Sequence, residues 1–107
     1  MTRWVLDRIL GEKCALFRPP HGNLSLRSLI TAWAAGQCVV LWSVDLKDYC
    51  ASTGDVEAQL ERTSLSSGDI ILYHGVNGAG LKALPQVIKA ALDKGRQAVT
   101  ISDLIRP

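Results

Sequence analysis

The stretch QCVVLWSV, residues 37–44, decides the fold class of this sequence. Its strongly apolar run is typical of a strand that a parallel sheet buries on both faces. Directly before it, residues 24–36 place apolar side chains at helical spacing, and Gly36 is the expected end of that helix. A helix that leads into a fully buried strand predicts an α/β chain.

Further helices and strands alternate on both sides of this stretch. The expected helices are residues 2–10, 24–36, 56–63 and a segment that ends near residue 94. The expected strands are residues 14–17, 37–44, 69–73 and 97–101. This alternation predicts right-handed βαβ units with parallel strands, either in an open doubly wound sheet or in part of a (β/α) barrel.

Three residues mark the predicted helix boundaries. Asp55 can cap the helix that begins at Val56. Pro85 is tolerated only in the first turn of a helix, so it limits where the helix that ends near residue 94 can begin. Ser102 is the expected cap of one more helical turn at the end of the sequence.

The composition restricts the classes of function. The 107 residues are 48% apolar, which is enough for a core in one domain at most. Twelve Lys and Arg against ten Asp and Glu leave a net charge of +2, too balanced for a nucleic-acid surface. No apolar run approaches the roughly 20 residues of a transmembrane segment. The three cysteines are too few and too widely spaced for a disulfide framework or a zinc knuckle.

Chemically active side chains follow three of the predicted strands. Arg18 follows the first strand, Asp45 the second and His74 the third. Sites of α/β proteins form at the C-terminal ends of parallel strands, where these residues would gather. An aspartate can hold a histidine for general acid catalysis, and an arginine can orient a carboxylate. The alternative is an ordinary ion pair between Arg18 and Asp45, with His74 capping a turn.

A rigid turn follows the first strand. Pro19 and Pro20 fix two φ angles in succession, and the first free amide after them belongs to His21. A preorganised backbone N–H is what an oxyanion hole requires. A plain rigid loop explains two adjacent prolines equally well.

Taken together, these segments resemble the polysaccharide deacetylases, the NodB-homology group of carbohydrate esterases. FRPPHG at residues 17–22 is similar to the third of the family's five motifs. WSVDLKDY at residues 42–49 is similar to the fourth, and GDIILYH at residues 68–74 to the fifth. The three occur in the family's order and extend the resemblance over almost the whole chain, about residues 2–105.

The resemblance implies catalytic roles for four residues. Arg18 would orient and tune the catalytic base. His74 would be the general acid that protonates the leaving amine. Asp45 is the first choice for the carboxylate that pairs with the imidazole, and Asp48 is the second. The implied activity is that of a hydrolase of carbon–nitrogen bonds other than peptide bonds.

Four further residues would bind substrate by the same resemblance. Pro20 would shape the turn whose next amide, that of His21, holds the tetrahedral oxyanion. Leu72 and Tyr49 would line the apolar pocket for the acetyl methyl group. The family usually has Tyr at position 21 and Trp at position 49, but a backbone donor and an aromatic wall are retained by His and Tyr.

The family's first two motifs have no counterpart in the sequence. They supply the catalytic base and the ligands of a divalent metal, zinc or similar, so no metal ligand is assigned to this chain. Residues 1–107 therefore resemble a single partial domain, the C-terminal half of the catalytic domain. The expected architecture is a partial, deformed (β/α) barrel with parallel strands, whose open strand edges would favour self-association or a missing N-terminal half.

These observations favour two functions and argue against a third. The first is a metal-dependent deacetylase of N-acetylated polysaccharide, present as its C-terminal half and inactive alone. The alternative is a non-catalytic remnant that binds carbohydrate or pairs with another subunit. The third, a small flavodoxin-like or response-regulator-like domain, lacks the phosphate loop or the acidic strand ends that it needs. The first ten residues are typical of an amphipathic helix rather than a signal peptide, although many family members are secreted or surface-bound.

Overall fold

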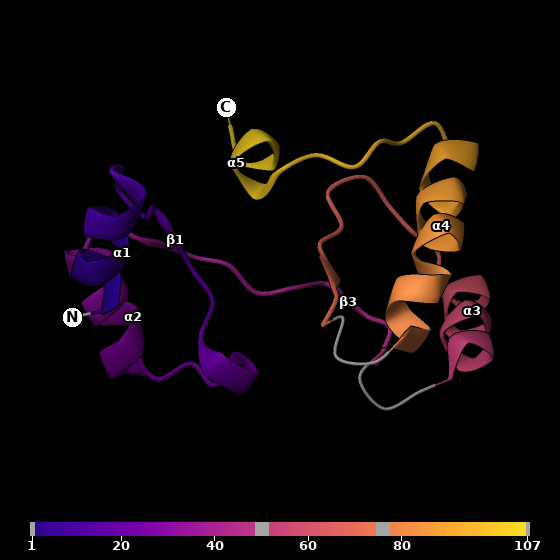
Figure 1. Cartoon of the computed structure of the whole chain (residues 1–107), viewed down its shortest axis with the longest axis horizontal. Coiled ribbons are helices and arrows are strands. Elements are labelled where there is room, and N and C mark those ends of the chain that lie inside the picture. Colours follow the sequence, from indigo (N-terminus) through magenta and orange to yellow (C-terminus); the bar gives the residue numbers. More distant parts are fainter. Residues whose placement is uncertain (1, 49–51, 75–77, 107) are drawn as a thin grey trace. The chain divides into compact units, whose positions relative to one another are not determined.

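The computed structural model describes residues 2–48, 52–74 and 78–106 of the chain (Figure 1). The chain folds as two compact units, residues 1–41 and 42–107. Each unit has helices beside a short pair of parallel strands. None of the helices in the described ranges is long and apolar enough to cross a membrane.

The first unit contains two strands that pair in parallel. Its elements are α1 (Thr2–Leu10), β1 (Leu16–Phe17), the 3-10 turn η1 (Pro20–Gly22), α2 (Leu26–Ala34) and β2 (Cys38–Val39). Leu16 is the register partner of Cys38, and Phe17 that of Val39. Helix α2 begins at a Ser25 cap, whose hydroxyl accepts the Ser28 N–H, and it packs against β2.

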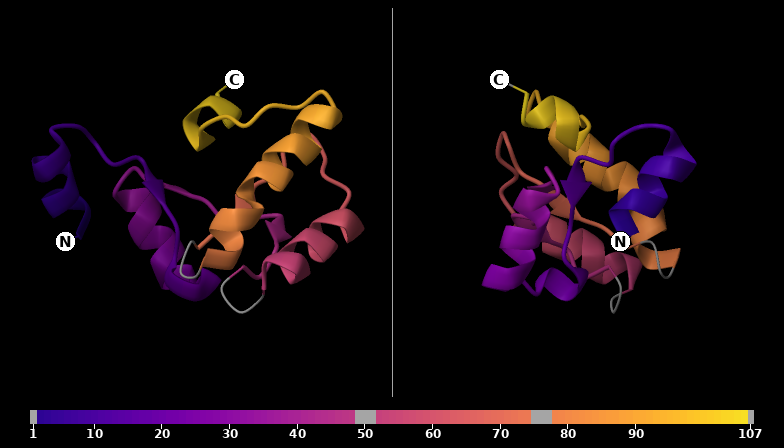
Figure 2. Two further views of the ribbon diagram at one scale, coloured as in Figure 1. Left: turned by 45° about the vertical axis from the view of Figure 1, so that its right-hand side comes forward. Right: turned by 90° about the vertical axis from the view of Figure 1, so that its left-hand side faces the viewer.

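The second unit holds the main hydrophobic core. Its elements are β3 (Val44–Asp45), α3 (Thr53–Arg62), β4 (Ile71–Leu72), α4 (Gly78–Asp93) and α5 (Ile101–Leu104). Strands β3 and β4 are parallel, and α3 and α4 lie side by side (Figures 1 and 2). The core consists of seven buried residues: Val44, Leu46, Val56, Leu60, Leu65, Ala83 and Val87.

The prediction of one continuous strand over residues 37–44 is wrong. It divides into β2 and β3, which belong to separate two-stranded sheets. The backbone changes its hydrogen-bond partner along the stretch: the Val40 N–H donates to the Phe17 carbonyl, whereas the Ser43 N–H donates to that of Ile70. The parallel pairing that was predicted is confirmed in both sheets.

The C-terminal predictions also need correction. Residues 97–100 form no strand, because no described segment pairs with them, and Ile101 begins α5. Thr100 rather than Ser102 caps this helix, and its hydroxyl accepts the Asp103 N–H. Pro85 lies inside α4, well beyond the first turn that was expected to hold it.

The predicted cap of α3 is displaced by three residues. Ser52 occupies the N-cap, and Asp55 is the third residue of the helix. The Ser52 hydroxyl accepts the Asp55 N–H, while the Asp55 carboxylate accepts the Ser52 N–H. This reciprocal capping box satisfies two amides that a helix start leaves open.

We expect acid to weaken the second unit through Asp69. The Ser66 N–H and the Ser43 hydroxyl donate to its carboxylate, and these bonds lower the pKa of Asp69 below its usual value. A lowered pKa means that the stabilisation is complete above about pH 4 and is lost as the pH falls through the folded-state value. Chemical denaturation between about pH 6 and about pH 3 should show a smaller loss of unfolding free energy for Asp69→Asn than for the wild type. An identical loss in both proteins would contradict this role.

Candidate functional site

A histidine and a buried aspartate form the centre of the candidate site. His74 follows β4, and its Nδ1 lies 3.0 Å from Oδ1 of Asp48. The backbone N–H of His74 donates to the other carboxylate oxygen, also at 3.0 Å. Asp48 is 1% exposed, whereas the His74 side chain is 34% exposed. One carboxylate therefore holds both the ring and the backbone of His74, and the ring's Nε2 lies on the edge away from that carboxylate.

The first turn of α4 supports the buried carboxylate. A Cβ built on Gly80 would lie 2.6 Å from Oδ2 and 2.8 Å from Cβ of Asp48, so the aspartate rests directly against the Gly80 backbone. The N-terminal end of a helix favours negative charge. Gly80 thus makes room for Asp48 at a place where the helix can stabilise the carboxylate.

Tyr73 also contacts the first turn of α4. Its hydroxyl donates a hydrogen bond to the Gly80 carbonyl, and its ring packs against the core. Burial, and next the negative charge of Asp48, raise the pKa of Tyr73 above its usual value near 10. The phenol therefore keeps its proton and remains a donor at neutral pH.

Sequence reasoning missed both Tyr73 and Gly80. The only signal for Tyr73 was its position next to His74. The signal for Gly80 was a glycine within the start of a helix, where it lowers helix stability unless the space is needed.

The first choice for the partner of His74 is corrected. Asp48 accepts from the imidazole, whereas Oδ1 of Asp45 accepts the backbone N–H of Lys47 at 2.8 Å. The alternation of a strand explains only why Asp45 points away from the core. Val44 and Leu46 point into the core beside α3 and α4, so Asp45 between them points to the opposite face.

Leu72 lies on the same face of the β3–β4 pair as Asp45. It is the register partner of Asp45 and is 7% exposed. Its neighbours Ile71 and Tyr73 pack against the core, so Leu72 points away from that cluster. Tyr49, its predicted companion in an acetyl pocket, lies outside the described residues.

The other predicted residues belong to the first unit. Arg18 is exposed directly after β1, and Pro19 is buried. Pro20 and His21 form η1, in which His21 has a left-handed φ of 56°. The next two amides, those of Gly22 and Asn23, donate to the carbonyls of Pro19 and Pro20. The backbone of this turn is therefore held by its own hydrogen bonds directly after the two prolines.

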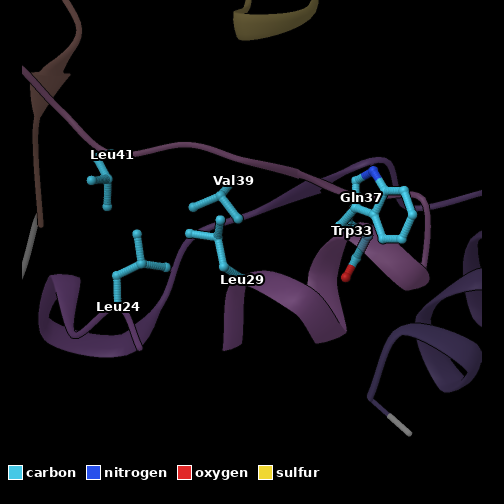
Figure 3. A pocket seen from close by; sticks show the side chains of 6 residues that line it. All are labelled: Leu24, Leu29, Trp33, Gln37, Val39 and Leu41. Atoms are coloured by element: carbon cyan, nitrogen blue, oxygen red, sulfur yellow. The ribbon is translucent and has the colours of Figure 1, made fainter. Parts of the chain in front are cut away.

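A hollow of about 370 Å³ also lies in the first unit, between α2 and β2. Figure 3 shows it from close by, with side chains from both elements pointing into it. Its lining residues are Leu24, Leu29, Trp33, Gln37, Val39 and Leu41. This lining carries no titratable group, so the hollow is a surface for apolar packing and not a place for acid–base chemistry.

The described residues do not fit a divalent metal. A catalytic zinc needs three protein ligands with an open fourth position. No group of three His, Cys, Asp or Glu residues in the described ranges is arranged to hold a metal ion. His74 also directs Nδ1 toward Asp48 rather than toward a ligand cluster.

We expect Gly80→Ala to disturb the site, because the new methyl group would overlap Asp48. Overpacking of this kind costs about 1–3 kcal/mol of unfolding free energy. Gly78→Ala is the matched control, since its Cβ meets nothing closer than Lys82 Cε at 3.9 Å. Chemical denaturation should separate the two variants, and equal stability would show that Asp48 moves aside without cost.

Known proteins resemble this chain along almost its whole length, although no protein-family profile matches it. It is 30% identical over 105 residues to the peptidoglycan-N-acetylmuramic acid deacetylase PdaC of Bacillus subtilis, covering 96% of this chain and 21% of that protein. It is 28% identical over 109 residues to a peptidoglycan-N-acetylglucosamine deacetylase of Bacillus cereus, covering 98% of this chain and 40% of that protein.

A solved structure agrees with these relatives. The family 4 carbohydrate esterase from Streptomyces lividans superposes with a TM-score of 0.81 at 28% identity, over 97% of this chain and 54% of that one. Almost the whole chain is similar to deacetylases of carbohydrate esterase family 4. The resemblance carried by the three sequence motifs is thereby confirmed. The chain spans about half the length of the Streptomyces structure and less of the two curated relatives.

Proposed function

We propose that the chain is the C-terminal half of a deacetylase that hydrolyses the acetamide group of an N-acetylated glycan. The pair of Asp48 and His74 carries this proposal. A buried carboxylate that orients a partly exposed imidazole is the arrangement that general acid catalysis requires. Two relatives are named as deacetylases of peptidoglycan sugars, which supports a glycan of that class as substrate.

His74 acts as the acid in the second half of the reaction. Breaking the C–N bond of the tetrahedral intermediate expels an amine, which is a poor leaving group without a proton. The protonated imidazole delivers that proton from Nε2, and acetate and the free amine result. Asp48 holds the ring by Nδ1–H and stabilises the imidazolium before the transfer.

The turn after β1 presents the oxyanion donor. The left-handed φ of His21 is unfavourable for a residue with a side chain, costing about 1–2 kcal/mol. Such strain persists where the surrounding structure imposes it, and it is concentrated at functional sites. The His21 N–H is the donor for the oxyanion. Arg18 at the start of the turn orients the catalytic base.

The remaining part of the active site would come from the other half of the barrel. In that arrangement the base and the metal ligands lie outside these residues. Large apolar side chains are exposed on both units, with exposed fractions of 80% for Trp33, 77% for Leu26 and 66% for Leu81. Exposure of this extent supports a covering half that completes a (β/α) barrel.

Acetate release from chito-oligosaccharide and from peptidoglycan fragments tests the function. The protein that contains this chain together with the other half of the barrel should release acetate. Isothermal titration with the same oligosaccharides, with and without chelator, measures binding separately. Binding without acetate release would indicate a non-catalytic glycan-binding protein rather than an enzyme.

A further inference from the structure

The bend between β3 and Asp48 has a geometry that regular pairing does not produce. In the β3–β4 register, Val44 pairs with Ile71 and Asp45 with Leu72. If this register continued, Lys47 would be the neighbour of His74. Instead Asp48 reaches His74, with both carboxylate oxygens within 3.0 Å of it. The stretch from Asp45 to Asp48 therefore contains one residue more than the opposing stretch from Leu72 to His74.

Lys47 is where the backbone accommodates the extra residue. Its φ is 52°, the left-handed region that a residue with a side chain adopts at a cost. The residues on either side are anchored, since Leu46 and Asp48 are each 1% exposed. A conformation that is unfavourable for lysine is thus held between two buried side chains, and some local interaction must favour it.

Asp45 provides that interaction. Its Oδ1 accepts the Lys47 N–H at 2.8 Å, which is the Asx turn by which an aspartate bends the backbone two residues ahead. Asp45 can do this because it points away from the core and belongs to β3, whose position is fixed by pairing with β4. The carboxylate thereby connects a fixed strand to the residue that directs Asp48.

We propose that Asp45 is a positioning residue for the acid pair, and that its hydrogen bond to the Lys47 amide sets the bend that delivers Asp48 to His74. The inference rests on the proposed function only in calling the pair catalytic. The geometry itself is a property of the folded chain. Asp45 thus acts on the imidazole through Asp48, and its own carboxylate does not take part in proton transfer.

The test follows the ring of His74 by nuclear magnetic resonance of the 107-residue chain. In the wild type, the acceptor Asp48 favours the Nδ1–H tautomer of the neutral ring. Asp45→Ala should lower the ratio of Nδ1–H to Nε2–H about tenfold, equivalent to about 1.4 kcal/mol. Asp48→Asn gives the spectrum of the His74 ring when the pair is broken. The ring signals of Asp45→Ala should therefore shift in the same direction as those of Asp48→Asn.

Two further variants separate positioning from general damage to the fold. Asp45→Asn keeps an oxygen acceptor for the Lys47 amide and should retain the wild-type tautomer ratio. The double variant Asp45→Ala, Lys47→Gly should recover it, because glycine adopts a left-handed φ without the cost that lysine carries. If Asp45→Ala fails to fold, Asp45→Asn and the double variant still test the positioning role independently.

The outcomes are distinct from those that decide the function. A wild-type tautomer ratio in Asp45→Ala would overturn the positioning role, as would an Asp45→Asn variant that behaves like the alanine variant. Failure of Lys47→Gly to recover the ratio would also overturn it. Acetate release plays no part in these measurements, so the positioning role can hold even if the proposed deacetylase activity fails, and the reverse is equally possible.

Discussion

Replacing His74 with asparagine should lower acetate release about 10²–10⁴-fold in the protein that carries the proposed active site, because the reaction loses its general acid. The asparagine amide can still donate to Asp48, but it cannot deliver a proton to the leaving amine. The loss should fall on kcat, with KM for the glycan little changed, since the proton is needed only as the C–N bond breaks.

Alanine at the same position is the complementary variant. His74→Ala should lower turnover to a similar extent and should also destabilise the fold, because it leaves the buried Asp48 carboxylate without the imidazole. Comparing the unfolding free energies of the alanine and asparagine variants separates the chemical role from the structural one. Turnover that survives in both variants would remove His74 from the mechanism.

Leu46→Ala should lower the unfolding free energy by about 2–5 kcal/mol, because it leaves a cavity in the centre of the core. Leu46 is 1% exposed and belongs to the core shared by β3, α3 and α4. It also lies between Asp45 and Asp48, so the cavity left by its side chain would loosen the bend that places the acid pair. Denaturation followed by far-ultraviolet circular dichroism gives the stability.

The matched control for that substitution is Leu81→Ala. Leu81 lies on α4 but is 66% exposed in this chain, so the same change should alter the unfolding free energy by no more than about 0.5 kcal/mol. Equal losses for the two variants would mean that the core is not centred on Leu46. A large loss for Leu81→Ala alone would show that a partner covers α4 in solution.

The chemistry of the candidate site was largely predictable. His74 and Asp45 were identified because they follow strands, and strand ends gather at one edge of a parallel pair. Asp48 was named only through the family resemblance, as the second choice. The choice between Asp45 and Asp48 was not, because it depends on a single left-handed residue, Lys47. Intrinsic propensity gives no warning of that conformation, since lysine adopts it only where its neighbours enforce it.

The helices were predictable for a similar local reason. Apolar periodicity and the glycines after them located α1 and α2 to within two residues, and these are properties of short segments. The division of residues 37–44 into β2 and β3 and the missing strand at residues 97–100 were not predictable. A strand exists only where another backbone offers hydrogen bonds, and periodicity does not report that partner.

The amino-acid order alone was therefore sufficient for the α/β class, the parallel pairing, the family and the residue types of the acid pair. Each of these depends on local patterns and short motifs. The folded chain decided which aspartate holds His74, why Gly80 must lack a side chain, and how Tyr73 secures the same turn. These depend on contacts between β3, β4 and α4, and only folding brings those segments together.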